Sequence, residues 1–390
     1  MASRFSNLER SATVALLDQV QALRAQGVKV LDLGGGEPDF ATADHIADAA
    51  STALREGFTH YTSSRGLPGL REAISEKLLK DNGLHADPAT DIIVTPSAKH
   101  ALFISLMAVL DPDDELIVPT PSWVSYKSMA QLAGARPVSA ELSADQGFRI
   151  TRDVLENCVS ARTKAILINT PNNPTGRVLD REEAQIVADF AIAHDLFVIA
   201  DEIYEKILYD GGEHISLASF PGCAERTLTV NGFSKGYAMT GWRLGYVAGS
   251  AEVIDQVLKV QEHTVGCTGS FVQRGGVSAL TGRQDVVQEM VDAYAARREL
   301  IVDGLNSLPG VRCSSPQGAF YAFADIRGSG FGTSADFAGW ALREAGVALT
   351  PGSAFGQGGE GHVRLSFATS DRVIEEALGR LSSALTARAR

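Results

Sequence analysis

Three apolar, β-branched runs in the middle of the chain each end in residues that can do chemistry. These residues carry an amide, a carboxyl, a phenol, a hydroxyl, an amine and a guanidinium group, and they are Asn173, Asp201, Tyr204, Ser234, Lys235 and Arg243. Taken singly, each has an ordinary structural explanation as a turn former, a helix cap, a half-buried aromatic or a solvated side chain. In an open α/β sheet, however, ligands bind beyond the carboxyl ends of the strands. We therefore predict that these side chains surround one crevice.

A fourth apolar run adds a candidate phosphate site. It leads through Thr-Pro to Ser97, Ala98 and Lys99 at the expected start of a helix. Unpaired backbone N–H groups and the helix dipole attract an anion at such a position. As an isolated residue Ser97 would be only a helix cap, but Ser234 and Arg243 can converge on the same place from another strand. The combination favours a phosphorylated cofactor.

The elements that must hold these residues follow a repeating pattern. Between about residues 85 and 250, short β-branched runs alternate with longer helical stretches, which is typical of βαβ units around a parallel sheet. We expect strands at 91–94, 115–118, 164–169, 196–200, 227–231 and 245–248, and helices that include 99–110 and 180–194. The predicted fold class is therefore α/β with a mostly parallel sheet.

The pattern changes after about residue 290. A helix at 291–308, a strand at 318–325, a helix at 335–346 and a strand at 362–367 predict a smaller α+β unit, which the N-terminal residues can join. We expect a large cofactor-binding domain at 46–290 and a small domain, built from 1–45 and 291–390, that closes on the substrate.

Length, composition and charge restrict the class of protein. The 390 residues suit two or three domains, and 45% hydrophobic with 21% charged residues is a globular balance. The formal net charge is -12, and the sequence contains no block of like charges. Neither nucleic acid nor anionic lipid is therefore an expected partner. The longest apolar stretch has about ten residues, half of what a membrane helix needs. Four scattered cysteines and an N-terminus without a secretory pattern predict a cytoplasmic location.

Two short motifs suggest other activities. A GxGxxG string at 356–361 follows no strand and leads into one, so we reject it as a dinucleotide fingerprint. A GxSxG string at 232–236 directly follows a strand, and Asp325 and His362 come after it in the order of an α/β-hydrolase triad. A serine hydrolase using Ser234 is thus an alternative, although it gives Lys235 no task. The histidines form no HExxH motif and no paired spacing with cysteine, so no metal is expected.

The ordered set of motifs resembles the fold-type I pyridoxal-phosphate enzymes, in particular the class I aminotransferases of the aspartate aminotransferase type. The resemblance covers essentially the whole chain. Its motifs are GEPDF at 36–40, YT at 61–62, WVSY at 123–126, NNPTG at 172–176, DEIY at 201–204, SK at 234–235, GWRLG at 241–245 and RLS at 364–366. Lys99 matches the bacterial subgroup with a lysine at that position.

The resemblance implies how these residues meet pyridoxal 5'-phosphate. Lys235 would hold the cofactor as a Schiff base and then move a proton between the substrate α-carbon and the cofactor. Asp201 would pair with the pyridine nitrogen and keep it protonated. Tyr204 and Asn173 would hydrogen-bond the phenolic oxygen, and Trp123 would stack on the ring. The phosphate would be held by the residues of the candidate anion site above.

The resemblance also implies the partners. Tyr61 would reach the phosphate from a neighbouring subunit, so a homodimer is expected. Arg364 would clamp the substrate α-carboxylate close to the backbone of Gly36, with Trp123 beside the substrate. Lys99 would meet the distal carboxylate of a dicarboxylic substrate.

The predicted function is therefore transfer of an amino group. An L-amino acid, aspartate or another dicarboxylic or aromatic one, would give its amine to the cofactor, and a 2-oxo acid such as 2-oxoglutarate would take it in a ping-pong reaction. Elimination, decarboxylation and oxidation use the same lysine and ring contacts and are alternatives. A non-enzymatic regulator of this fold is disfavoured because such proteins carry an added DNA-binding domain, whereas this chain is acidic and starts directly with the enzyme-like segment.

Overall fold

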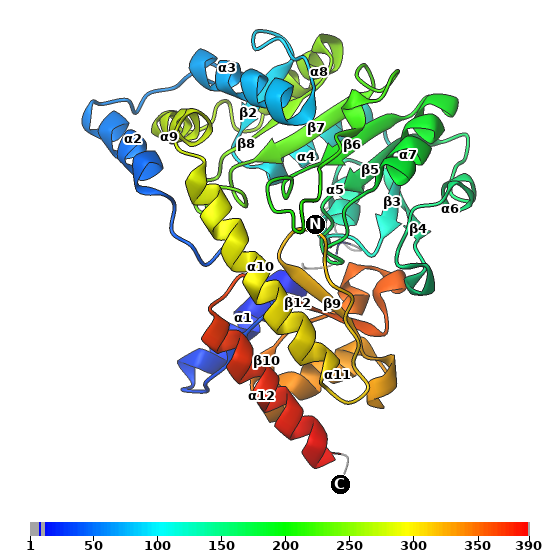
Figure 1. Ribbon diagram of the computed structural model, residues 1–390. Coiled ribbons are helices and arrows are strands. Elements are labelled where there is room, and N and C mark those ends of the chain that lie inside the picture. The colour runs from blue at the N-terminus through cyan, green and yellow to red at the C-terminus, as the bar shows by residue number, and fades with distance from the viewer. Residues whose placement is uncertain (1–7, 9–11, 389–390) are drawn as a thin grey trace.

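A seven-stranded sheet lies at the centre of the larger part of the protein, in a computed structural model that describes residue 8 and residues 12–388 (Figure 1). Its strands are β2 (Ile92–Thr95), β3 (Glu115–Thr120), β4 (Arg136–Glu141), β5 (Thr163–Asn169), β6 (Phe197–Asp201), β7 (Thr227–Gly232) and β8 (Gly245–Ala248). They follow the order β2-β8-β7-β6-β5-β3-β4, and β8 runs antiparallel to both of its neighbours. The other neighbouring strands pair in parallel, as the sequence predicts.

Helices cover both faces of this sheet. Successive residues of a strand point to opposite faces, so Leu167 packs into the apolar cluster with α4 (Ala98–Val109), whereas Ile166 and Ile168 pack into the cluster with α7 (Arg181–Ala193). The central strands are therefore apolar throughout, which explains their continuous β-branched runs. The remaining helices of this part are α2 (Asp44–Arg55), α3 (Pro68–Lys77), α5 (Ser125–Leu132), α6 (Arg152–Glu156), α8 (Ala251–Glu262) and α9 (Ser270–Thr281).

The smaller part combines the two ends of the chain. The long helix α10 (Asp285–Asn306) crosses from the large sheet to the side of α12 (Asp371–Arg388) (Figure 1). An antiparallel sheet has the order β11-β12-β9. Its strands are β11 (Thr350–Pro351), β12 (His362–Ser366) and β9 (Tyr321–Asp325), and α11 (Ser334–Trp340) packs beside them. The N-terminal strand β1 (Leu31–Asp32), which follows α1 (Ala12–Ala25), pairs in parallel with β10 (Val347–Ala348).

Several elements differ from their predicted bounds. Strand β4 was not predicted because its sequence, RPVSAE, is polar and lies at a sheet edge. The helix predicted at 335–346 is α11 followed by a π-helical turn at Ala341–Ala345. Helix α10 begins at Asp285, so the predicted domain boundary after residue 290 falls inside a helix; the division into two domains stays a prediction.

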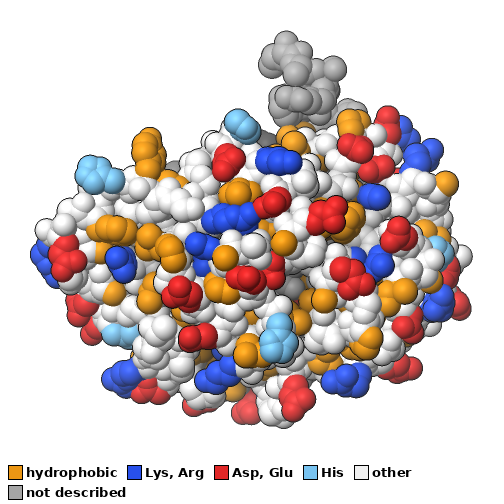
Figure 2. Space-filling model, turned by 90° about the horizontal axis from the view of Figure 1, so that it is seen from above, with side chains coloured by type: hydrophobic (Ala, Val, Ile, Leu, Met, Phe, Trp, Pro, Cys, Tyr) orange, Lys and Arg blue, Asp and Glu red, His pale blue; other side chains and the backbone are white. Residues whose placement is uncertain are grey.

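The structure also bears on the GxGxxG string and on the expectation that no helix crosses a membrane. The GxGxxG string forms 3-10 turns between β11 and β12 and starts no helix, so it is no dinucleotide site. None of the helices at residues 12–388 is both long and apolar enough to cross a membrane. On the face shown in Figure 2, acidic and basic side chains are interspersed.

Candidate active site

A cleft of about 660 Å³ opens beyond the carboxyl ends of β5, β6 and β7 and is closed on its far side by β9 and β12. Every residue predicted for the site, with one exception, lines it. These residues are Gly36, Ser97, Ala98, Lys99, Trp123, Asn173, Asp201, Tyr204, Ser234, Lys235, Arg243 and Arg364. The exception is Tyr61, which is 97% exposed and takes no part in the cleft of its own chain.

Lys235 lies directly after β7, where the strand ends at Gly232. Its ammonium donates a hydrogen bond to the carbonyl of Gly36 and lies 5.9 Å from the ring centre of Tyr204. Burial lowers the pKa of Lys235 to about 8, although nearby Glu37 opposes the shift. A fraction of the amine is therefore neutral near pH 7, which is the form that attacks a carbonyl carbon.

Asp201 is the last residue of β6 and is buried. Its Oδ2 accepts a hydrogen bond from the hydroxyl of Tyr126 over 2.6 Å, and its Oδ1 accepts the backbone N–H of Ile203. Burial raises the pKa of Asp201 to about 6, while the hydrogen bond from Tyr126 acts in the opposite direction. At neutral pH the carboxylate is charged and no cationic side chain of the described residues is bonded to it, so it suits a positively charged ring nitrogen.

Arg364 and Asn173 meet across the cleft. Asn173 sits in the NNPTG turn after β5, where its backbone N–H donates to Asn169 Oδ1. Arg364 on β12 donates from Nη1 to Asn173 Oδ1 over 2.9 Å and from Nη2 to the carbonyl of Gly34 over 2.6 Å. Among the described residues no carboxylate lies within 4.0 Å of this buried guanidinium, and its Nε has no hydrogen-bond partner. A buried cation is ordinarily paired, so Arg364 is suited to a carboxylate that arrives with a ligand.

The anion site predicted from the sequence would lie at the start of α4. Ser97 caps the helix by accepting the N–H of His100, and no acidic residue occupies the first turn. Strand β8 passes so close to this helix start that a Cβ added at Gly245 would lie 2.3 Å from the N atom of Ala98. Only glycine fits at this position. Ser234 and Arg243 line the same cleft, so hydroxyls, backbone N–H groups and a guanidinium are available to an anion.

Lys99 and Trp123 lie together at the cleft wall. The ammonium of Lys99 is 5.1 Å from the ring centre of Trp123. Burial lowers the pKa of Lys99, and the nearby charge of Arg243 lowers it further. Lys99 has no acidic partner within ion-pair distance in the part of the chain that the structure describes.

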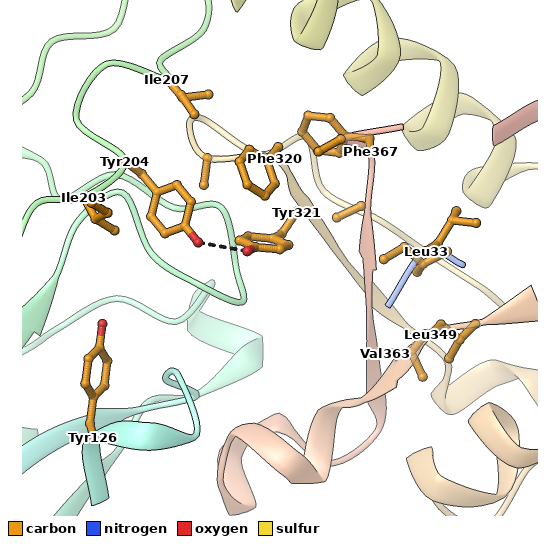
Figure 3. Close-up of a cluster of buried hydrophobic side chains, with 14 of the residues drawn as sticks. Leu33, Tyr126, Ile203, Tyr204, Ile207, Phe320, Tyr321, Leu349, Val363 and Phe367 are labelled. Atoms are coloured by element: carbon orange, nitrogen blue, oxygen red, sulfur yellow. Dashed lines mark hydrogen bonds between the residues drawn. The ribbon is translucent and has the colours of Figure 1, made fainter. Parts of the chain in front are cut away.

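Sequence reasoning did not assign a function to Tyr126 or Tyr321. Tyr126 belongs to the WVSY motif and lies one helical turn after Trp123, so its spacing was a signal that it reaches the same cleft. Tyr321 begins β9, and its hydroxyl lies 2.8 Å from that of Tyr204 (Figure 3). No spacing predicts that contact, because 117 residues separate the two.

The hydrolase alternative is wrong. Ser234 lines the cleft, but neither Asp325 nor His362 does. The imidazole of His362 stacks on Phe323 with ring centres 4.9 Å apart, and the Asp325 carboxylate pairs with Arg327. The strand before Ser234 is followed by turns rather than by the helix that a nucleophile elbow requires.

Comparison with known proteins identifies the family. The family model described as aminotransferase class I and II matches residues 28–381. The chain belongs to this family. An aspartate aminotransferase of Musicola paradisiaca (strain Ech703) is 48% identical over 386 residues, which cover 99% of this chain and 96% of that protein. An aromatic-amino-acid aminotransferase 2 of Thermococcus litoralis is 42% identical and covers 93% of both chains.

A solved structure of the aspartate aminotransferase from Thermus thermophilus with maleate has a TM-score of 0.94 and 40% identity, covering 98% of this chain and 99% of that one. The predictions of a fold-type I aminotransferase, of transfer from an amino acid to a 2-oxo acid and of pyridoxal 5'-phosphate as cofactor are confirmed.

The residues of this aminotransferase fit that cofactor. The cleft offers an amine with a lowered pKa, a buried carboxylate that no cationic side chain of the described residues pairs with, and a helix start free of acids. These groups complement an aldehyde, a ring nitrogen and a phosphate, respectively, and the cleft volume lies within the range of ordinary ligand pockets.

Proposed function

We propose that this aminotransferase uses aspartate as its amino donor, with 2-oxoglutarate as the acceptor. The observation that carries the proposal is a pair of cations, Arg364 and Lys99, that line one cleft without an acidic partner among the described residues. A substrate with two carboxylates can pair with both. Charged hydrogen bonds of this kind strengthen greatly in a site that excludes water.

Each side chain of the cleft has its own role in the proposed reaction. The bound cofactor supplies an electron sink that stabilises negative charge at the substrate α-carbon. Lys235 would hold the cofactor, and its Nζ would then be the group that moves the proton between the substrate α-carbon and the cofactor. Asp201 holds a proton at the pyridine nitrogen, and Tyr204 and Asn173 donate to the phenolic oxygen. Arg364 holds the α-carboxylate, and the small residue Gly36 lets that group approach the backbone.

Cofactor binding is completed by residues around the helix start and by a second subunit. Ser97, Ala98, Ser234 and Arg243 bind the phosphate, and Trp123 packs on the ring. We infer a homodimer in which Tyr61 of each chain reaches the phosphate in the other. This proposal is supported by the almost complete exposure of the Tyr61 ring, which is unusual for an aromatic side chain. The cytoplasm is the proposed location.

Aromatic amino acids are the second candidate donors. The cleft is also lined by Val14, Leu16 and Leu102, which can pack against an apolar side chain. The Lys99 ammonium rests over Trp123 and is held by no hydrogen bond among the described residues, so it can move aside.

A half-reaction tests the donor. The purified protein with its cofactor is mixed with aspartate, glutamate, phenylalanine or alanine, one at a time and without any oxo acid. We expect aspartate to remove the visible band at the lowest concentration, because the amino group then resides on the cofactor. A preference for phenylalanine over aspartate would reject the proposed donor, and no change with any amino acid would reject transamination.

A substitution at Lys99 tests the reason for the preference. Lys99→Met keeps the length of the side chain and removes its charge. We expect kcat/KM for aspartate to fall by roughly 10–100-fold, the range of a lost charged hydrogen bond, and kcat/KM for phenylalanine to stay within about twofold. An equal loss for both substrates would show that Lys99 does not bind the distal carboxylate.

A further inference from the structure

Tyr321 touches two residues of the site that come from different parts of the molecule. Its hydroxyl lies 2.8 Å from the hydroxyl of Tyr204, which follows β6 of the large sheet (Figure 3). The face of its ring supports Arg364 of the small sheet, whose guanidinium carbon is 4.4 Å from the ring centre. The ring of Phe355 also contacts this guanidinium, at 5.0 Å. One side chain thus contacts both the phenol that faces the cofactor and the guanidinium that faces the substrate carboxylate.

The position of Tyr321 is tightly determined. The residue is 1% exposed, and its ring packs against Phe320 and Tyr204 at centre distances of 4.9 Å and 5.8 Å. A Cβ at Gly36 would lie 2.8 Å from its hydroxyl oxygen, so this oxygen rests directly on the glycine whose carbonyl accepts a hydrogen bond from Lys235. Strand β9 holds the residue by pairing with β12, where Tyr321 lies opposite Ser366.

The direction of the hydrogen bond between the two hydroxyls follows from counting protons. Each phenol has a single proton to donate. If Tyr204 donates its proton to the phenolic oxygen of the cofactor, its oxygen must accept the proton of Tyr321. A hydroxyl that accepts one hydrogen bond becomes a stronger donor in the next. Burial also raises the pKa of Tyr204, so its hydroxyl keeps its proton over the working pH range.

We propose that Tyr321 is a positioning residue with two separable tasks, in which its hydroxyl orients Tyr204 as a donor and its ring holds Arg364 in place for the substrate carboxylate. The proposal rests on the roles proposed above for Tyr204 and Arg364. It explains why an aromatic ring with a polar end, rather than an aliphatic side chain, lies between the two. Phenylalanine would keep the second task and lose the first, whereas leucine would lose both.

The first readout is the pH at which the visible band of the bound cofactor changes. Without a strong donor, the negative phenolic oxygen holds the neighbouring proton more tightly, so the pKa of this spectral change rises. For Tyr321→Phe we expect a rise of about 0.5–1 pH unit, the equivalent of one ordinary hydrogen bond. Tyr204→Phe should raise it further, and adding Tyr321→Phe to Tyr204→Phe should add nothing.

The second readout is the binding of maleate to the enzyme with its cofactor, because this dicarboxylate has no amino group and cannot react. Tyr321→Phe should leave the dissociation constant within about twofold, since the ring still supports Arg364. Tyr321→Leu should weaken maleate binding by about tenfold through loss of that support. A general loss of packing would not change the pKa of the spectral transition in Tyr321→Phe while leaving its maleate binding intact.

Tyr209→Phe is the matched control. Tyr209 is a buried tyrosine of the same apolar cluster, and its hydroxyl donates to the carbonyl of Ala319 rather than to Tyr204 or Arg364. We expect the pKa of the spectral change and the dissociation constant of maleate in Tyr209→Phe to match those of the wild type. If Tyr204→Phe shifts the band and Tyr321→Phe does not, the proposal is overturned while the role of Tyr204 stands. If Tyr204→Phe shifts nothing, the proposed role of Tyr204 fails and the proposal falls with it.

Discussion

Replacing Tyr126 by phenylalanine removes one hydrogen bond from a buried carboxylate and leaves the surrounding packing unchanged. The hydroxyl donates to Asp201 Oδ2 over 2.6 Å, and the ring makes an edge-to-face contact with Trp123 that phenylalanine keeps. A hydrogen bond to a charged group contributes roughly 1.5–3 kcal/mol, which corresponds to about 1–2 pKa units. The pKa of Asp201, which burial has already raised to about 6, should therefore rise further in Tyr126→Phe, to about 7–8.

The shift has a defined effect on cofactor binding. A hydrogen bond donated to the charged form lowers the pKa of a carboxyl group, so its removal raises that pKa. Below its pKa, Asp201 is neutral and no longer pairs with a protonated ring nitrogen. Cofactor affinity of the wild-type apoenzyme should thus decline below about pH 6, and that of Tyr126→Phe below about pH 7–8. At pH 7 about a tenth to a half of Asp201 would be charged in the variant, against about nine-tenths in the wild type, so the variant should bind pyridoxal 5'-phosphate about two- to tenfold more weakly.

The assay is a titration of each apoenzyme with pyridoxal 5'-phosphate between about pH 5 and pH 9, followed by absorbance. Tyr237→Phe serves as the control, because that buried hydroxyl bonds to Gln284 and does not line the cleft. The reasoning is refuted if Tyr126→Phe shows the pH dependence of the wild type. It is also refuted if the variant loses the same affinity at every pH, since that pattern would mean a change of shape rather than of protonation.

Three further outcomes follow from the same site. Asp201→Asn should stabilise the apoenzyme in denaturant titrations by about 3 kcal/mol at pH 8, because the raised pKa of Asp201 means that its charged form opposes folding above about pH 6. That difference should shrink as the pH falls from about 6 and vanish below about pH 3, where Asp201 is protonated in both the folded and the unfolded state. Arg364→Leu should lower kcat/KM for aspartate by about 100-fold or more in steady-state assays, and an unchanged value would remove Arg364 from carboxylate binding. Gly245→Ala should displace the start of α4 and weaken cofactor binding by more than about tenfold, whereas Gly69→Ala, whose Cβ meets nothing within 4 Å, should not.

The strand ends were predictable because their geometry is local. Asn169 and Asp201 are register partners on β5 and β6, and Asp201 is the partner of Val230 on β7. Parallel neighbours must present their carboxyl ends at one edge, so residues that follow buried runs in the sequence meet in space. The same logic failed for the polar edge strand β4, whose residues carry no apolar pattern.

Contacts across the two parts of the molecule could not be predicted in this way. Tyr321 reaches Tyr204 only because β9 pairs with β12 and the segment before β9 forms a bridge, Gly318 with Leu208, to the segment after β6. The carbonyl of Gly34 that accepts from Arg364 lies 330 residues away in sequence, beside a two-residue strand. Such contacts depend on how the elements pack, and neither periodicity nor motif spacing encodes them.

The ionisable groups of the cleft share one property that links stability to function. Burial raises the pKa of Asp201 and lowers those of Lys235 and Arg364, so each charged form is disfavoured in the empty cleft. In the proposed roles, a protonated ring nitrogen and a substrate carboxylate would supply the opposite charges that Asp201 and Arg364 lack among the described residues. Charges that destabilise the apoenzyme therefore become paired on binding, and part of the binding free energy is relief of this unfavourable burial. The unpaired charges that make the site receptive are therefore also the reason why ligand binding should stabilise the folded chain.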